Sequence, residues 1–202
     1  HHRSSAASDV YKRQRLKKTN ETISIDNPEI SVLFADIVNF TVMSEKLSAE
    51  NIVGFLDDMF SKFDELTGKY EVEKIKTIGD AYMVVSGLTS ENRSHASILF
   101  EFGQELLKIA SNYKDHKGEP ITLRIGINSG PAVSGVIGKS KFSFDIWGDT
   151  INTAARLESY GVPSRIHMSE KTFELINQNI EHQKKTIAVS YTHLRAHETR
   201  FY

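Results

Sequence analysis

Two aspartates stand where apolar segments of the chain end, and carboxylates in such places are candidate metal ligands. Asp36 follows the run Val-Leu-Phe-Ala, and Asp80 lies in a short glycine-containing connection between two β-type runs. An ionised carboxylate after an apolar run is costly to desolvate unless positive charge meets it. If the fold brings both acids together, their hard oxygen atoms suit Mg²⁺, which takes one or two carboxylates plus substrate phosphates. From spacing alone, a helix cap at Asp36 and an ordinary turn residue at Asp80 remain open.

A second pair of polar residues, Asn152 and Arg156, lies four positions apart in a segment with a helical pattern. Residues at this spacing project from one face of a helix. They could act together on one ligand. The alternative is a solvated helix face on which Arg156 pairs with Glu158 or another acid.

The elements that must position these residues follow from hydrophobic periodicity and turn signals. Ser48 is a suitable N-cap for an amphipathic helix. The segment Ser129-Gly130-Pro131 is expected to be a turn joining two strands. Strands are predicted over 30–37, 72–78, 82–86, 122–128, 132–137 and around Ile166; further helices are predicted over 94–113, 149–159 and from Ser169.

The order of these elements is β-α-β-β-α-β with further elements appended. This order predicts an α+β fold with a ferredoxin-like βαββαβ core and appended α/β elements, in which helices cover one face of an antiparallel sheet. The same architecture hosts many chemistries, so the fold alone does not indicate a function.

Bulk composition is that of one globular domain. The chain has 202 residues, 39% hydrophobic and 25% charged, with a net charge of −1 and no cysteine. The near-zero charge argues against nucleic acid or an anionic membrane as a partner, and the absence of cysteine excludes disulfides and thiolate metal sites. No apolar run approaches the roughly 20 residues that span a bilayer, so we expect no membrane contact within this chain. These features fit a cytoplasmic domain.

Three long motifs occur in order: FADIVNFT at 34–41, EKIKTIGDAYM at 73–83 and FDIWGDTINTAARLE at 144–158. Together they closely resemble the class III adenylate and guanylate cyclase catalytic domain, over about residues 30–176. The resemblance implies a cyclase that releases pyrophosphate when the ribose 3′-hydroxyl attacks the α-phosphate. A diguanylate cyclase is disfavoured because the chain lacks a Gly-Gly-Asp/Glu-Glu-Phe loop.

The resemblance also implies roles for the residues that match the motifs. Two divalent metal ions, Mg²⁺ or Mn²⁺, would be held by Asp36, Asp80 and the carbonyl of Ile37. Amides around Phe40 and Thr41 would cradle the triphosphate, as helix N-termini bind anions. Asn152 would position the ribose, and Arg156 would neutralise charge on the α-phosphate.

In the resembling family, the positions of Lys76 and Asp145 read the base. Lysine only donates hydrogen bonds and an ionised aspartate only accepts them, which matches the edge of adenine rather than guanine. The resemblance therefore implies ATP as substrate and cyclic AMP as product. A solvated strand lysine and a turn aspartate are the plain alternative; guanylate cyclase activity is the alternative within the family.

Each active site of the family lies between two catalytic domains. Because this chain carries both the acids and the Asn152/Arg156 pair, the resemblance implies a homodimer with two shared sites, or a heterodimer with a related domain. A silent regulatory half of a heterodimer is disfavoured, since such partners typically lose one of these groups.

The chain departs from the family pattern at several places. Asn39 replaces a glycine after Asp36, and because asparagine tolerates a left-handed backbone, we expect the loop to be kept. Asn128 stands where histidine is common. Residues 1–14 are expected to be a non-native leader and 190–202 a non-native tail, with native disordered tails as the alternative; 15–29 is expected to be a linker, and 30–189 a catalytic domain truncated at its C-terminus.

Overall fold

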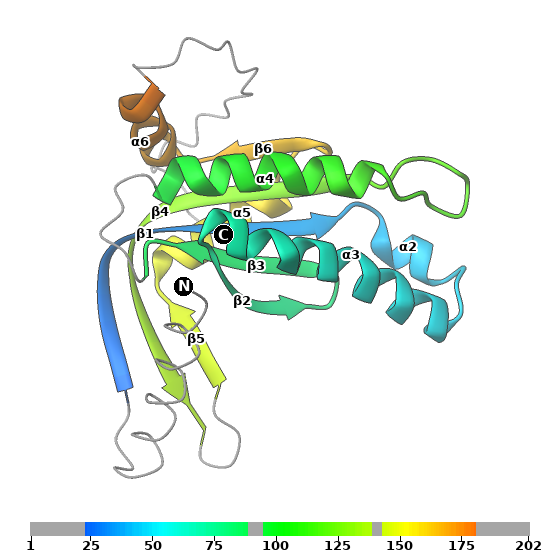
Figure 1. Cartoon of the computed structure of the whole chain (residues 1–202), viewed down its shortest axis with the longest axis horizontal. Coiled ribbons are helices and arrows are strands. Elements are labelled where there is room, and N and C mark those ends of the chain that lie inside the picture. Colours follow the sequence, from blue (N-terminus) through cyan, green and yellow to red (C-terminus); the bar gives the residue numbers. More distant parts are fainter. Residues whose placement is uncertain (1–22, 89–94, 139–142, 181–202) are drawn as a thin grey trace, which may run out of the picture.

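The computed structural model describes residues 23–88, 95–138 and 143–180 (Figure 1). The expected leader and tail, and the ends of the linker and catalytic domain that adjoin them, lie outside these residues. The described elements are β1 (Ile23–Ile37), α2 (Phe40–Ser44), α3 (Ala49–Tyr70), β2 (Glu73–Ile78), β3 (Ala81–Ser86), α4 (His95–Ser111), β4 (Leu123–Ile137), β5 (Ser143–Trp147), α5 (Asp149–Ser159), β6 (Arg165–Met168) and α6 (Glu170–Ile180).

The strands form one sheet in the order β2-β3-β1-β4-β5, and β6 pairs with β4. The β1–β3, β2–β3, β1–β4 and β4–β5 pairs are antiparallel, whereas β6 runs parallel to the first half of β4. With α3 and α4 as the connections between strands, the order β2-β3-β1-β4 is that of a ferredoxin-like core. The predicted fold class is confirmed.

One predicted turn is wrong, because β4 is a single strand across Ser129-Gly130-Pro131. Hydrogen bonding to β1 continues on both sides of this segment, from the pair Ile37/Leu123 to the pair Ile23/Val136. The register shifts between Asn27 and Ile30, opposite Pro131. Since proline lacks an N–H, it fits such a bulge without losing a ladder bond.

Two other elements differ from the predictions. Strand β1 begins at Ile23, seven residues before the predicted start of this strand, and residues 23–27 pair with β4. Strand β5, which carries Asp145, was not predicted at all. The N-cap prediction is confirmed, since the Ser48 hydroxyl accepts a hydrogen bond from the amide of Asn51 (3.2 Å).

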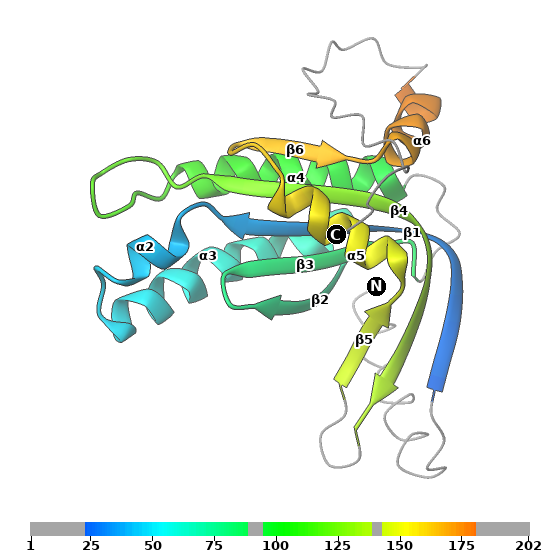
Figure 2. The same ribbon diagram turned by 180° about the vertical axis from the view of Figure 1, so that it is seen from behind.

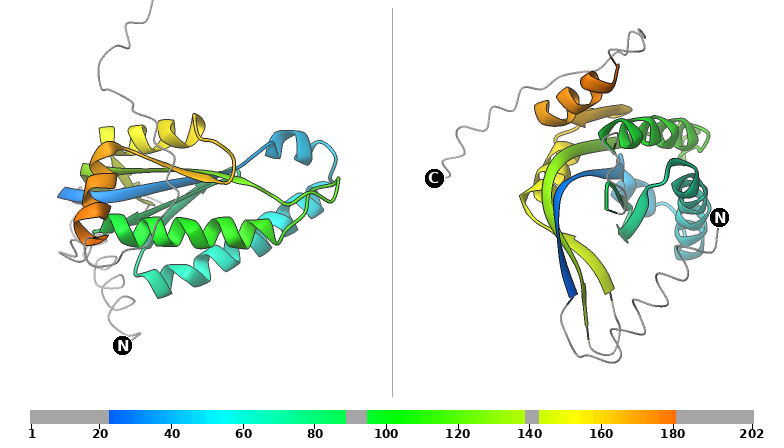
Figure 3. Two further views of the ribbon diagram at one scale, coloured as in Figure 1. Left: turned by 90° about the horizontal axis from the view of Figure 1, so that it is seen from above. Right: turned by 60° about the vertical axis from the view of Figure 1, so that its left-hand side comes forward.

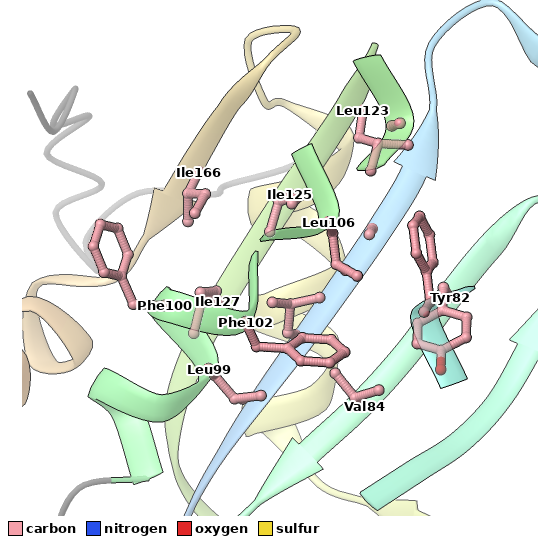
Figure 4. Packing of buried hydrophobic residues seen from close by; sticks show 14 of the residues in the cluster. Tyr82, Val84, Leu99, Phe100, Phe102, Leu106, Leu123, Ile125, Ile127 and Ile166 are labelled. Carbon is pink, nitrogen blue, oxygen red and sulfur yellow. The ribbon is translucent and has the colours of Figure 1, made fainter. Parts of the chain in front are cut away.

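Helices cover both faces of the sheet, not one as expected (Figure 3). Helices α3, α4 and α6 cover one face and close the larger core, where Phe102 and Leu106 of α4 pack with Val84 of β3 and Ile125 of β4 (Figure 4). Helix α5 covers the opposite face, where Ala154 packs with Ile30, Val32 and Phe34. The side chains of β1 alternate between these two cores, as a strand period of two requires.

The second half of β4, with β5 and the start of β1, extends beyond the helices as an arm (Figures 1 and 2). Several large apolar side chains are exposed on it: Ile25, Val133, Ile137, Phe144 and Trp147. Within the described ranges, no helix has both the length and the apolar character needed to cross a bilayer.

Candidate active site

Asp36 and Asp80 meet at one end of the sheet. Ala35 of β1 pairs with Tyr82 of β3, so Asp36 stands beside the tip of the β2–β3 hairpin. That hairpin has a two-residue loop, Gly79-Asp80, between the paired residues Ile78 and Ala81. Gly79 has φ 63, a conformation that glycine adopts at little cost and that suits the first position of a tight hairpin turn.

The electrostatics of Asp80 reflect this proximity. Burial raises the pKa of Asp80 to about 6; the negative charge of Asp36 and a hydrogen bond with Asp36 add to the rise, while the amides of Asp80 and Ile37 oppose it. Two like charges that are both partly removed from water favour binding of a cation. The expected convergence of the two acids is therefore present.

The donors at this end of the sheet fit a divalent ion such as Mg²⁺. Among the described residues, no group of three or more His, Cys, Asp or Glu is placed to hold a metal. The protein thus offers two carboxylates, and the remaining ligands must come from backbone oxygens, water or substrate, as is usual for Mg²⁺. Ile37 directly follows Asp36 in the chain, and its amide hydrogen-bonds Asp80, so its backbone lies beside both acids.

Two further residues of this site, Arg124 and Glu158, were not predicted. Arg124 of β4 donates through Nη2 to Asp36 Oδ2 (2.6 Å) and through Nε to Glu158 Oε1 of α5 (3.0 Å). The available signal was a lone arginine inside the apolar run Leu-Arg-Ile-Gly-Ile. Because Glu158 is bound to Arg124, the alternative in which it pairs with Arg156 is not what the structure shows.

The short helix α2 begins at Phe40, four residues after Asp36. Asn39 precedes it with φ 59 and ψ 25, so asparagine does take the left-handed conformation expected at the glycine position. Phe40 is half-buried against the larger core and Thr41 is exposed. The first amides of α2 are therefore close to Asp36 along the chain.

Lys76 and Asp145 form an ion pair between β2 and β5, with Nζ 2.5 Å from Oδ2. The lysine side chain is 40% exposed and the aspartate 16%. The two residues are paired with each other and Asp145 lies in a strand, so they are not the solvated lysine and the turn aspartate of the alternative interpretation. Asp145 also accepts the amide of Ile146 (2.9 Å), which orients its carboxylate.

Asn152 and Arg156 are both exposed on α5, whereas Thr150, Ala154, Leu157 and Glu158 of the same helix are buried. They share one face, as predicted, and that face points away from the sheet. The same helix thus turns Glu158 towards Arg124 and Asp36 of its own chain, but turns Asn152 and Arg156 outwards.

Close backbone contact fixes α5 on the sheet. A Cβ at Gly126 of β4 would come within 2.2 Å of the Glu158 nitrogen and 2.3 Å of the Ala154 oxygen, so only glycine fits. Asn128 donates to the carbonyl of Thr150 (3.0 Å) and ties the start of α5 to β4. This bond gives Asn128 a structural role.

Comparison with known proteins agrees with this geometry. The sequence pattern of the adenylate and guanylate cyclase catalytic domain matches residues 24–201. The chain is 40% identical over 167 residues to an adenylate cyclase of Mycobacterium bovis, covering 82% of this chain and 38% of the relative. It is 39% identical over 180 residues to the receptor-type guanylate cyclase gcy-5 of Caenorhabditis elegans, covering 88% of this chain and 16% of the relative. The chain therefore spans well under half the length of these relatives.

A solved structure with a similar fold is the catalytic core of a rhodopsin-guanylyl cyclase with converted specificity in complex with ATPαS. It superposes with a TM-score of 0.74 at 35% identity and covers 79% of this chain and 86% of that one. The sequence resemblance is thereby confirmed, and the chain belongs to the family of adenylate and guanylate cyclase catalytic domains.

Proposed function

We propose that this domain converts ATP to 3′,5′-cyclic AMP and pyrophosphate, in intracellular signal transduction. The observation that carries the choice of ATP is the Lys76–Asp145 pair, in which a donor-only group lies 2.5 Å from an acceptor-only group. Adenine presents an acceptor at N1 and a donor at its exocyclic amine. Guanine presents the reverse order and leaves buried groups unpaired.

Asp36, Asp80 and the Ile37 carbonyl are the proposed ligands of two divalent ions, Mg²⁺ or Mn²⁺. Bound ions of this kind favour loss of the attacking hydroxyl's proton and neutralise phosphate charge. The contacts of Arg124 support this role, since its single charge is shared between Asp36 and Glu158 and does not neutralise both Asp36 and Asp80. Asp36 and Asp80 repel each other and are therefore suited to bind a cation together.

The remaining proposed roles concern positioning and charge, which dominate phosphoryl transfer. Amides around Phe40 and Thr41 hold the triphosphate tail at the start of α2. Asn152 hydrogen-bonds the ribose and orients its 3′-hydroxyl, and Arg156 neutralises charge that builds on the α-phosphate. Side chains take little covalent part in this reaction.

Two copies of the chain are proposed to form each site. The exposed face of α5 presents Asn152 and Arg156 away from Asp36 of the same chain, which supports a site completed by a second copy. The exposed apolar side chains of the β4–β5 arm, Phe144 and Trp147 among them, are suited to burial in an interface. A homodimer with two shared sites satisfies both features; a related cyclase domain is the alternative partner. The nucleotide substrate and the absence of cysteine fit the cytoplasm.

The test is an assay of cyclic product from ATP and from GTP with the purified chain, first with Mg²⁺ and then with Mn²⁺. We expect cyclic AMP from ATP in the presence of metal, and none after chelation by EDTA. Preferential formation of cyclic GMP would identify a guanylate cyclase, the activity named for several relatives. No product from either nucleotide, with the dimer verified, would identify a regulatory half.

A further inference from the structure

A chain of two ion pairs joins the metal end of the proposed site to helix α5. Asp36 at the end of β1 is bound to Arg124 of β4 (2.6 Å), and Arg124 is bound to Glu158 of α5 (3.0 Å). The side chains of Asp36, Arg124 and Glu158 are 19%, 31% and 11% exposed. A guanidinium is planar, so two acceptors on different nitrogens fix its orientation.

Glu158 is held in place from its own side. The contact of Gly126 with the backbone of Ala154 and Glu158 fixes this turn of α5 against β4. The Ser159 hydroxyl also donates to Glu158 Oε2 (3.3 Å). The backbone of Glu158 is therefore fixed by the packing of α5, and its carboxylate has a partner in α5, Ser159, besides Arg124.

This position is unfavourable for a carboxylate on its own. Burial raises the pKa of Glu158, and the nearby charge of Asp36 raises it further, while Arg124 lowers it. Buried ion pairs are often replaced by apolar residues at no loss of stability. A contribution to the stability of the fold therefore does not by itself explain why residue 158 is a glutamate.

Resting on the function proposed above, we propose that Glu158 is a positioning residue of the metal site. It fixes the guanidinium of Arg124, and Arg124 in turn holds the Asp36 carboxylate beside Asp80. One helix then serves two sites of the dimer. The buried face of α5 organises the acids of its own chain, and the exposed face presents Asn152 and Arg156 to the acids of the other.

The test uses mixed dimers with one complete site, purified through two different tags. An Arg156→Ala chain supplies Asp36 and Asp80, and an Asp36→Ala chain supplies α5. Glu158→Gln is then placed on one chain or the other. On the Arg156→Ala chain, we expect the Mn²⁺ concentration for half-maximal activity to rise about tenfold, with kcat at saturating Mn²⁺ within about twofold. On the Asp36→Ala chain, we expect neither value to change.

Equal effects from both chains would show that Glu158 only supports α5, and no effect from either would show that it does nothing for the metal; both outcomes overturn the proposal. The matched control is Glu105→Gln on the Arg156→Ala chain, because Glu105 is also paired with a cation, Lys108 (2.7 Å), but lies on α4. We expect it to leave the Mn²⁺ dependence unchanged. An inactive mixed dimer without any Glu158 change would count against shared sites, not against Glu158.

A second measurement does not depend on activity. Binding of Mn²⁺ alone to the otherwise unaltered chain is followed by the EPR signal of free Mn²⁺. We expect Glu158→Gln to weaken binding about tenfold, and to add nothing when Arg124→Lys is already present, since the effect passes through Arg124. Additive losses would overturn the proposal. If Glu158→Gln does not fold by circular dichroism, Arg124→Lys alone tests the same link, and unchanged Mn²⁺ binding by that variant overturns it.

Discussion

Lys76 and Asp145 are 69 residues apart in the sequence, yet their charged groups lie 2.5 Å from one another across β2 and β5. Ile75 and Ile146, next to them in the chain, join the smaller core, which anchors both strands at the pair. In the proposed function, the order of donor and acceptor in this pair selects adenine over guanine.

Exchange of this pair should reverse the base preference. Because a glutamate accepts where Lys76 donates, we expect Lys76→Glu with Asp145→Cys to shift the ratio of kcat/KM for ATP over GTP by about 10²-fold towards GTP. The shift is smaller than the roughly 10⁴–10⁵ possible at a fully buried site, since Lys76 is 40% exposed. The measurement is initial rate on each nucleotide.

Lys74→Glu is the control for that exchange. It makes the same charge change as Lys76→Glu two residues away on β2, where Lys74 pairs with Asp64 (2.7 Å), and it should leave the ratio near that of the unaltered chain. An ATP preference that survives the double substitution would rule out this pair as the base reader.

Complementation between two inactive chains should restore activity. If Asp36 of one copy works with Arg156 of the other, Asp36→Ala and Arg156→Ala homodimers are each inactive, but mixing them creates one intact site per mixed dimer. At a statistical mixture, half the dimers are mixed and each has one of two sites, so about a quarter of the original activity should return. The measurement is cyclic AMP formed after mixing and re-equilibration, with dimers checked by light scattering.

Mixtures of Asp36→Ala with Asp80→Ala serve as the control, because both changes damage the acidic half and no intact site can form. Verified mixed dimers of Asp36→Ala and Arg156→Ala that stay inactive would contradict shared sites.

Asp80→Asn should stabilise the metal-free protein at neutral pH. The folded-state pKa of Asp80 is raised to about 6, above the value of 3.8 for a free aspartate. The contribution of this group to stability is therefore fully present below pH 4 and is lost as the pH rises through about 6. Because Asp80 is only half-buried, solvent screening limits the gain at pH 7.5 to about 1 kcal/mol, or 2–4 °C in Tm, about the shift expected for a domain of this size.

Thermal melts with EDTA and with Mn²⁺ test this expectation. Mn²⁺ should raise the Tm of the unaltered chain by mass action and that of Asp80→Asn much less. The difference between the two chains should vanish below pH 4. A metal-free Asp80→Asn chain that melts lower than the unaltered chain at pH 7.5 would contradict the crowding of two acids.

Gly126→Ala should displace α5. A Cβ at this position would lie 2.2 and 2.3 Å from two backbone atoms of the helix, which cannot rotate away. We expect a loss of about 3 kcal/mol, or about 10 °C in Tm, and a loss of activity, because α5 carries Asn152 and Arg156.

Gly54→Ala is the matched control for Gly126→Ala. Gly54 lies in α3, and a Cβ there meets nothing within 4 Å, so alanine should stabilise the helix by about 0.5–1 kcal/mol. Thermal melts of both variants test these two expected changes in stability. Equal melting temperatures for the two would show that α5 can shift to make room.

The sequence alone was sufficient to predict the roles of residues that depend only on their neighbours in the chain. Three contiguous motifs identified the family. The order of elements predicted the ferredoxin-like core. Local backbone features could also be predicted at Ser48, Asn39 and Gly79, each from the residue type. A helix cap, a left-handed backbone conformation and a tight hairpin each depend on a few consecutive residues, so they can be recognised in the sequence without knowledge of the rest of the fold.

Long-range pairing decided what the sequence did not. Ser129-Gly130-Pro131 has the composition of a turn, but the ladder with β1 holds it within the single strand β4, opposite a bulge in β1. Arg124 meets Asp36 and Glu158 across separations of 88 and 34 residues. Hydrophobic periodicity identifies which side chains are buried, but not which of the few buried charges are neighbours; that depends on strand order and on how closely α5 approaches Gly126.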